Sequence, residues 1–162
     1  MNDMTIRYVV GDATAPHDHD CRVIAHLCNN VGGWGAGFVR AVSARSAEPE
    51  AAYRRWFRER PHSGFRLGAV QMVQINEHMY VANMIGQDGI RSRSNLHPIR
   101  YQALDRCLAT LAGLTRGLGA SVHMPRIGTG LAGGTWDQIE PRILTRLCAK
   151  GIAVTVYNLP TR

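Results

Sequence analysis

The sequence contains no apolar run that approaches the ~20 residues needed for a membrane-spanning helix. Its first segment, MNDMTIRYVV, lacks the basic region and apolar core of a secretory signal peptide, so we expect a cytoplasmic protein with no membrane partner. Internal repeats, low-complexity stretches and linkers are also missing, which excludes repeat and multi-module architectures. We expect residues 1–162 to form a single domain, because this length can bury a proper core.

Paired cysteines are missing as well. The four cysteines show no metal-type spacing, so we expect reduced and mostly buried thiols. They are Cys21, Cys28, Cys107 and Cys148. The segment from His17 to Cys21 alternates possible metal ligands, but it lies in a polar loop without a second ligand cluster to complete a tetrahedral site. We therefore expect no metal ion and no cofactor.

Acidic residues are outnumbered by basic ones, 12 to 19, which gives a formal net charge of +7 supplied almost entirely by arginine. Such a surplus indicates an anionic partner, either nucleic acid or a phosphorylated small molecule. A solvated basic surface is the commoner explanation for any single arginine. The contents of 45% hydrophobic and 19% charged residues are ordinary for a globular protein.

Glycine is abundant in the stretch SVHMPRIGTGLAGGTW, residues 121–136. Its pattern predicts a short strand closed by Pro125, a glycine-rich loop and the start of a helix. The loop glycines are Gly128, Gly130, Gly133 and Gly134. Glycines let the backbone approach a ligand, and the unpaired N–H groups of such a turn point at an anion. The stretch indicates a phosphate cradle or, alternatively, a helix connection that is glycine-rich for conformational reasons alone.

A second unit of strand, glycine loop and helix begins at Val23–Cys28 and continues through NNVGGWGAG to a helix expected at residues 38–47. Each of the two units can offer backbone N–H groups to one phosphate of a diphosphate. The spacing G-W-G-A-G lacks the full dinucleotide-binding fingerprint, and no acidic residue follows at the expected distance. A conventional nicotinamide-binding domain is therefore disfavoured.

Apolar periodicity predicts the remaining elements. Strands are expected at residues 5–10, 67–75, 78–85 and 152–159, and helices at residues 49–60, 99–117 and 135–150. The aromatic residues Tyr53, Trp56 and Phe57 recur at helical spacing, which indicates a core face rather than a base-stacking platform. This order of elements predicts an α/β domain with a mixed sheet between helices and a ligand at the carboxyl ends of the strands.

Three ordered motifs together resemble those of a macrodomain. They are GDAT at residues 11–14, HLCN at residues 26–29 before a Gly-Ala-Gly turn, and PRIGTGLAGG at residues 125–134. The resemblance extends to Val154–Tyr157. Through CNNVGGWGAGF and MPRIGTGL it is strongest to the small branch with the fungal ADP-ribose-1″-phosphate phosphatase and the terminal ADP-ribose protein glycohydrolase. It implies a three-layer α/β/α sandwich with a central mixed sheet of about six strands and a monomer that binds ADP-ribose.

The resemblance also assigns binding residues by position. Asp12 would accept from the adenine amino group beside the backbone N–H of Ala13, and Tyr157 or Asn158 would border the adenine. Asn29 would lie by the distal ribose. The first loop along the diphosphate and distal ribose would comprise Gly35, Ala36, Gly37 and Phe38. The second would comprise Gly128, Thr129, Gly130 and Leu131, followed by Ala132.

Two departures from that branch bear on the reaction. The glycohydrolase has a lysine near the position of Gln87 and an aspartate near that of Ala132, a pair that resembles a Schiff-base mechanism. Another branch places an aromatic residue at Ala132. This chain has none of the three, so a lysine nucleophile is not supported.

What remains for chemistry is a bound water at the anomeric carbon, from which the leaving group departs through an oxocarbenium-like state. We expect Gln87, Asn29 or Asn30 to orient this water, and Asp88 or His26 to transfer a proton. A core histidine bonded to a neighbouring strand is an equally good interpretation of His26.

The sequence leaves three functions open. The leading hypothesis is an ADP-ribosyl hydrolase that acts on ADP-ribosylated protein or, alternatively, nucleic acid. The other two are a phosphatase of ADP-ribose-1″-phosphate and a reader module that binds ADP-ribose without catalysis. A protein that binds nucleic acid through its basic surface alone is less favoured.

Overall fold

The computed structural model describes residues 5–16 and 20–160. Six strands, four α-helices and one 3₁₀ turn follow one another in the order expected from the sequence. They are β1 (Arg7–Val10), β2 (Arg22–Asn29), α1 (Val39–Arg45), α2 (Glu48–Arg58), β3 (Val70–Asn76), β4 (Met79–Gln87), α3 (Tyr101–Leu118), β5 (Ser121–Met124), α4 (Trp136–Arg146), the 3₁₀ turn (Cys148–Lys150) and β6 (Val154–Asn158).

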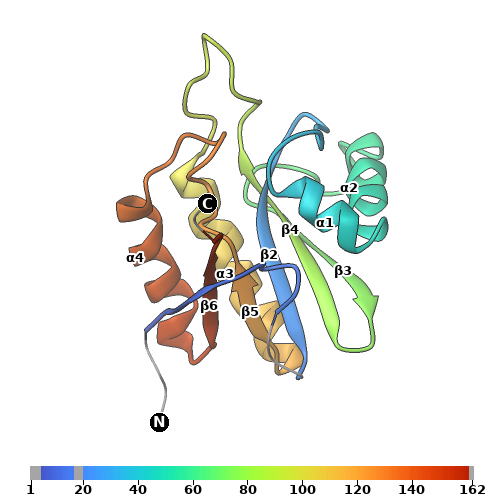
Figure 1. Cartoon of the computed structure of the whole chain (residues 1–162). Coiled ribbons are helices and arrows are strands. Elements are labelled where there is room, and N and C mark those ends of the chain that lie inside the picture. The colour runs from blue at the N-terminus through green and yellow to red at the C-terminus, as the bar shows by residue number, and fades with distance from the viewer. Residues whose placement is uncertain (1–4, 17–19, 161–162) are drawn as a thin grey trace.

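The strands form one mixed sheet in the order β1-β6-β5-β2-β4-β3. All neighbouring strands are parallel except β3 and β4, which form an antiparallel hairpin. Helices α1 and α2 cover one face of the sheet and α3 and α4 cover the other (Figure 1). The expected three-layer α/β/α sandwich is therefore confirmed.

Two apolar clusters hold the layers together. The larger one joins α3 and α4 to the sheet, and the smaller one joins α1 and α2 to the other face. Strand β2 contributes to both clusters, with Val23 and Ala25 on the α3 side and Ile24 and Cys28 on the α1 side. This alternation explains the continuous apolar run of β2, since a central strand is buried on both faces.

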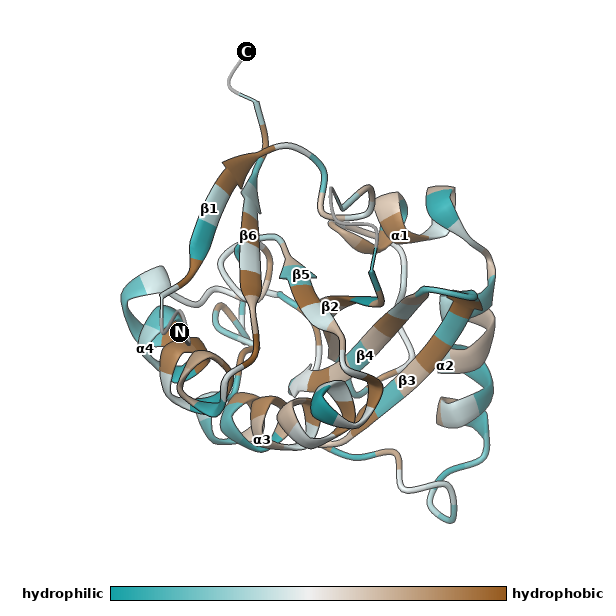
Figure 2. Cartoon of the chain, turned by 90° about the horizontal axis from the view of Figure 1, so that it is seen from below, coloured by the Kyte–Doolittle hydropathy of each residue, from teal (hydrophilic) through white to brown (hydrophobic). Residues whose placement is uncertain are grey.

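Helices on the surface of this sandwich are amphipathic, and in Figure 2 both α2 and α3 carry hydrophilic and hydrophobic stretches. In α2 the aromatic residues turn inward. Tyr53 is fully buried, and the rings of Tyr53, Trp56 and Phe57 all lie within 6 Å of the Phe65 ring, with centroid distances of 5.7, 4.9 and 5.3 Å. The expected core face of this helix is the observed one.

Some element boundaries differ from those expected. The last helix ends at Arg146 instead of residue 150, because the chain continues as a 3₁₀ turn closed by Gly151 at φ 82°. In the hairpin, Asn76 pairs with Met79, so the connection is Glu77–His78 rather than Asn76-Glu77. The Asn76 Oδ1 accepts from the His78 N–H at 2.9 Å and thereby tightens this turn.

The sequence predicts neither a metal site nor a membrane-spanning helix. The alternating ligands from His17 to His19 lie outside the described residues, and the described part of the chain holds no cluster suited to a metal ion. Within the same part of the chain, no helix is both long and apolar enough to cross a membrane.

Parallel pairing brings the carboxyl ends of five strands to one edge of the sheet. The glycine loop after β2, the loop after β4 and the glycine loop after β5 all start at this edge. Ligands of open α/β sheets bind outside the carboxyl ends of the strands. The topology therefore predicts a ligand site at these three loops.

Candidate functional site

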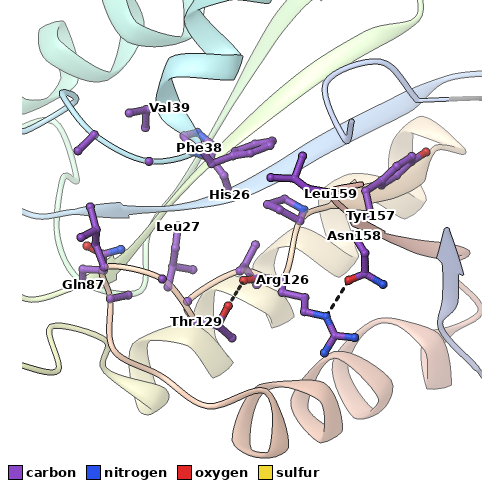
Figure 3. Close-up of a pocket in the computed structure, with 18 residues that line it drawn as sticks. His26, Leu27, Phe38, Val39, Gln87, Arg126, Thr129, Tyr157, Asn158 and Leu159 are labelled. Atoms are coloured by element: carbon purple, nitrogen blue, oxygen red, sulfur yellow. Dashed lines mark hydrogen bonds between the residues drawn. The ribbon is translucent and has the colours of Figure 1, made fainter. Parts of the chain in front are cut away.

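Two adjoining cavities, each of about 350 Å³, open at this edge. The first lies between the start of α1, the glycine loop after β5 and the end of β6, with Gln87 at one end and Tyr157 and Asn158 at the other (Figure 3). The second lies beside Asn29 and the glycine loop after β2. Five residues line both cavities, which makes them parts of one groove: Leu27, Ala36, Val39, Gln87 and Leu131.

Most glycines of the second loop, residues 125–134, are required by internal packing. A Cβ on Gly128 would lie 2.7 Å from the Ile99 Cδ1, and one on Gly134 would lie 2.7 Å from the Gly128 carbonyl oxygen. Gly128 and Gly133 also have φ values of 77° and 74°, which favour glycine. The conformational explanation of these glycines is correct at these positions.

Gly35 and Gly130 differ from these glycines. Neither has a positive φ, and a Cβ on either would meet no atom within 4 Å. Gly35 lines the second cavity and Gly130 the first. The absence of a side chain at these two positions therefore leaves open space in the groove, and the fold does not require glycine there.

The backbone donors of both loops remain available at the groove. In the described part of the chain, no hydrogen bond engages the N–H groups of Gly35, Ala36, Gly130 or Leu131. The loops face each other, since a Cβ on Gly37 would lie 4.0 Å from the Leu131 Cδ1. Two sets of unused backbone N–H groups on opposite walls suit an extended anion such as a diphosphate.

Asn29 lines the second cavity, but its carboxamide is engaged in the first loop. Its Oδ1 accepts from the N–H groups of Val31 and Gly33, both at 3.0 Å, and from the Tyr53 hydroxyl at 2.9 Å. Its Nδ2 donates to the Gly33 carbonyl at 2.9 Å. The Asn29 carboxamide therefore holds the loop that follows β2, and the water-orienting role expected of it stays a prediction.

Asn30 and Asp88 line neither cavity, and their expected roles in catalysis stay predictions. The Asn30 Oδ1 accepts from the Gly89 N–H at 2.8 Å, and its Nδ2 donates to the Asp88 Oδ1 at 3.1 Å. The Asp88 Oδ2 lies 3.8 Å from the Arg100 guanidinium. Asn30 and Asp88 follow the last residues of β2 and β4, and their side chains bond to each other outside the groove lining.

His26 lines the first cavity but is 2% exposed. Its Nε2 lies 2.6 Å from the Asn83 Oδ1, and its ring packs edge-on against Trp34 at 5.2 Å. Burial lowers the pKa of His26 to about 4, so the ring is neutral near pH 7. These contacts fit the core interpretation of His26, and a neutral ring is not charged to act as a proton donor near pH 7, so the proton-transfer role expected of it stays a prediction.

Gln87 ends β4 and lines both cavities. Its side-chain amide has no hydrogen bond with any described residue. None of the described residues that line the two cavities is an aspartate or glutamate. Gln87 is therefore the predicted catalytic residue whose polar group remains available at the groove.

The expected adenine-binding residues gather near the ends of β1 and β6. Tyr157 and Asn158 line the first cavity, whereas Asp12 and Ala13 line neither cavity. The Asp12 Oδ1 accepts from the backbone N–H of Thr14 at 2.8 Å and from its hydroxyl at 2.7 Å. Asp12 therefore caps its own turn and lies beside this end of the groove, since the Gly11 N–H donates to the Asn158 carbonyl at 2.9 Å.

The other residues assigned by the resemblance line the cavities, and their contacts with a ligand stay predictions. Ala36, Gly37 and Phe38 line the first cavity from one side, and the second loop lines it from the other through Gly128, Thr129, Gly130, Leu131 and Ala132. Ala132 is 3% exposed and packs in the larger apolar cluster. The Thr129 hydroxyl donates to the Arg126 carbonyl at 2.8 Å, so it shapes the loop.

Sequence reasoning missed two arginines at the groove. Arg126 lines the first cavity and Arg91 the second. The available signals were the position of Arg126 inside the motif PRIGTG and the concentration of arginine in IRSRS. Neither signal shows which face an arginine occupies, so only the folded chain separates these two from the solvated arginines.

No family model matches the chain. A macrodomain protein of Streptomyces coelicolor is 54% identical, with a TM-score of 0.86, over 94% of this chain and 98% of that one. A Bacteroides thetaiotaomicron protein of unknown function is 52% identical, with a TM-score of 0.91, over 96% of this chain and 99% of that one.

Two curated relatives are more distant. The Danio rerio chromodomain-helicase-DNA-binding protein 1-like is 32% identical over 162 residues, which are 94% of this chain and 15% of that protein. The chain thus spans a small part of that relative's length. The ADP-ribose 1″-phosphate phosphatase of Lodderomyces elongisporus is 25% identical over 147 residues, with 85% of this chain and 89% of that protein covered.

Proposed function

This chain belongs to the macrodomain family, and we propose that it binds ADP-ribose in the groove and hydrolyses ADP-ribosyl linkages with water as the nucleophile. The observation that carries the proposal is the pair of facing loops whose backbone N–H groups are unused. A diphosphate has anionic oxygens on two adjacent phosphorus atoms, one for each loop. A groove of this size also suits a ligand with one sugar on either side of a diphosphate.

The lining of the groove orients this ligand. The first cavity offers apolar and aromatic surface from Phe38, Tyr157 and Leu159, which suits a purine base. The second cavity offers Gln87 and Arg91, which suit the distal ribose and what is attached to it.

The proposed reaction uses no protein nucleophile. The single lysine of the chain, Lys150, lies at the opposite edge of the sheet in the 3₁₀ turn. The oxygen of a water oriented by the Gln87 amide bonds to the anomeric carbon, and the bond from that carbon to the acceptor oxygen breaks. The acceptor leaves with the electron pair, and the water loses its proton to solvent or substrate phosphate.

The lining also selects a linkage class. Without a carboxylate at the described groove residues, no side chain is placed to protonate a poor leaving group. A carboxylate leaving group needs no protonation, so we propose esters of acidic residues in ADP-ribosylated protein as the substrate. The partner is then a modified protein rather than modified nucleic acid.

Turnover tests the proposal, with protein carrying mono-ADP-ribosyl esters as substrate. We expect Gln87→Ala to lower kcat about tenfold to a hundredfold while KM changes little, because the amide acts on the water and not on the bound ligand. Gln74→Ala, an exposed position on β3 away from the groove, is the matched control and should keep full activity. ADP-ribose binding by calorimetry is measured on all three proteins.

The same lack of a carboxylate favours a second candidate, a reader that binds ADP-ribose without turnover. Binding without release of ADP-ribose above the buffer rate would reject the hydrolase and leave this reader. Release of inorganic phosphate from ADP-ribose-1″-phosphate would identify a phosphatase instead. Absence of ADP-ribose binding would reject all three.

A further inference from the structure

Arg126 follows β5 and lines the first cavity with a side chain that is held on three sides. Its Nε donates to the Asn158 Oδ1 at 2.8 Å (Figure 3). Its guanidinium carbon lies 5.4 Å from the centre of the Tyr8 ring and 5.2 Å from that of Trp136. These contacts orient the guanidinium toward Asn158 and the two rings in the absence of a ligand.

The charge of Arg126 has no direct counterion within residues 5–16 and 20–160. Among the described residues, no carboxylate oxygen lies within 4.0 Å of its nitrogens. Glu140 belongs to the same surface cluster, but it accepts from the Tyr8 hydroxyl and from the Trp136 indole, the latter at 3.3 Å. The two terminal nitrogens of Arg126 therefore keep their four N–H donors available.

An oriented guanidinium with unused donors in a cavity wall suits a second anion. Arginine binds phosphate through two parallel N–H···O bonds, and a guanidinium that is already oriented loses less freedom when it forms them. The diphosphate of the proposed ligand already has the backbone donors of two loops. Arg126 lies instead beside Asn158, at the end of the groove that holds Tyr157 and Leu159 and suits the base.

We propose that Arg126 forms a subsite for a phosphate monoester on the adenosine ribose, so that the groove prefers ADP-ribose phosphorylated on this sugar to ADP-ribose itself. The inference rests on the proposed function, because it takes the adenosine half of the ligand to lie in the first cavity. It adds a substrate class that is recognised at the end of the groove opposite to the reaction.

Calorimetry with ADP-ribose and ADP-ribose 2′-phosphate tests this subsite on the full chain. We expect the 2′-phosphate to bind about tenfold more tightly, as two charge-assisted hydrogen bonds partly offset by desolvation would give. The preference should shrink as salt is raised, since the subsite is exposed. Arg126→Gln should remove the preference, and Arg126→Lys should keep only part of it because the ammonium lacks the planar fork.

Two controls separate this effect from a general loss of charge or of ligand. Arg116→Gln removes one positive charge from the exposed end of α3, away from the groove, and should keep the tenfold preference. ADP-ribose-1″-phosphate carries its extra phosphate at the other ribose, so Arg126→Gln should not change its affinity relative to that of ADP-ribose.

The outcomes distinguish the two proposals. Equal affinity of the natural chain for ADP-ribose and its 2′-phosphate would overturn the subsite and leave the proposed function standing. No binding of either ligand would overturn both. If Arg126→Gln did not fold, the two ligands compared on the natural chain would still decide the matter.

Discussion

The side-chain amides of Asn29 and Gln87 are chemically alike, but they differ in their hydrogen bonding at the groove. Asn29 makes four hydrogen bonds within and beside the first loop, to Val31, Gly33 and Tyr53. Gln87 makes none with the described residues and faces both cavities. A saturated amide holds backbone in place, whereas an unsaturated one is available to a ligand or water. This difference is why the catalytic proposal rests on Gln87.

His26 predicts a dependence of stability on pH. Its pKa is about 4 in the folded protein against an ordinary value of 6.5. The unfolded chain therefore binds the proton first as pH falls, and the free energy of unfolding should decrease between pH 6.5 and pH 4, by up to about 3 kcal/mol from this residue. Above pH 6.5 both states are neutral at this position, and the full stability is present.

Urea unfolding at pH 7, 5.5 and 4 measures this dependence. His26→Gln keeps a polar partner for Asn83 but cannot titrate, so its stability should fall less over the same interval than that of the natural chain. Parallel pH profiles for the two proteins would contradict the assignment of this slope to His26.

At the scale of the element, each glycine loop combines positions required by the fold with positions open to the ligand. The loop after β5 turns at Gly128 in the left-handed region and packs there against Ile99 and Ile139. Gly130, two residues later, has neither constraint. Gly128 therefore holds the loop in its conformation, whereas Gly130 leaves the backbone without a side chain at the groove.

Substitution of these two glycines should separate stability from binding. Gly130→Val is expected to change the free energy of unfolding by less than about 0.5 kcal/mol, while its side chain enters the groove and weakens ADP-ribose binding at least about tenfold. Gly128→Ala is expected to destabilise by about 1–3 kcal/mol, because it is strained in φ and would meet Ile99 at 2.7 Å. Urea unfolding and calorimetry together measure both effects.

The opposite pattern would contradict this division of the loop. In particular, unchanged ADP-ribose affinity in a folded Gly130→Val variant would show that the ligand does not cross this face of the loop. The contrast needs no outside control, since each variant serves as the control for the other.

At the scale of the whole molecule, the groove joins elements that are far apart in sequence. Its walls come from the loops after β2, β4 and β5 and from the end of β6. A ligand that contacts all of them binds the folded chain and not the unfolded one. Binding should therefore stabilise the entire fold by mass action.

A thermal shift measures this coupling. ADP-ribose at a hundredfold excess over its Kd should contribute about 2.7 kcal/mol, which for a chain of this size corresponds to a Tm rise of about 5–10 °C. The Gly130→Val variant at the same ligand concentration should show a smaller rise. A Tm that does not respond to ADP-ribose in the natural chain would contradict the proposed ligand.

The sequence alone determined the sandwich, the mixed sheet and the two glycine loops. Hydrophobic periodicity and glycine placement are local properties, and they follow from the burial of each strand and from the backbone freedom of each turn. The resemblance to macrodomains added ADP-ribose as the expected ligand. The mixed sheet, the layers and the family are confirmed by the structure and its relatives.

Only the tertiary structure decided which side chains face the groove. Asn29 and Asn30 are neighbours of one residue type, as close in sequence as Gln87 and Asp88, yet one member of each pair lines the groove and the other does not. Pairing of β2 with β4 places Asn29 opposite Gln87 at the groove, whereas Asn30 and Asp88 follow the two strand ends and bond to each other. The same holds for Arg126, whose partners on β1, α4 and β6 are adjacent to it only in the folded chain.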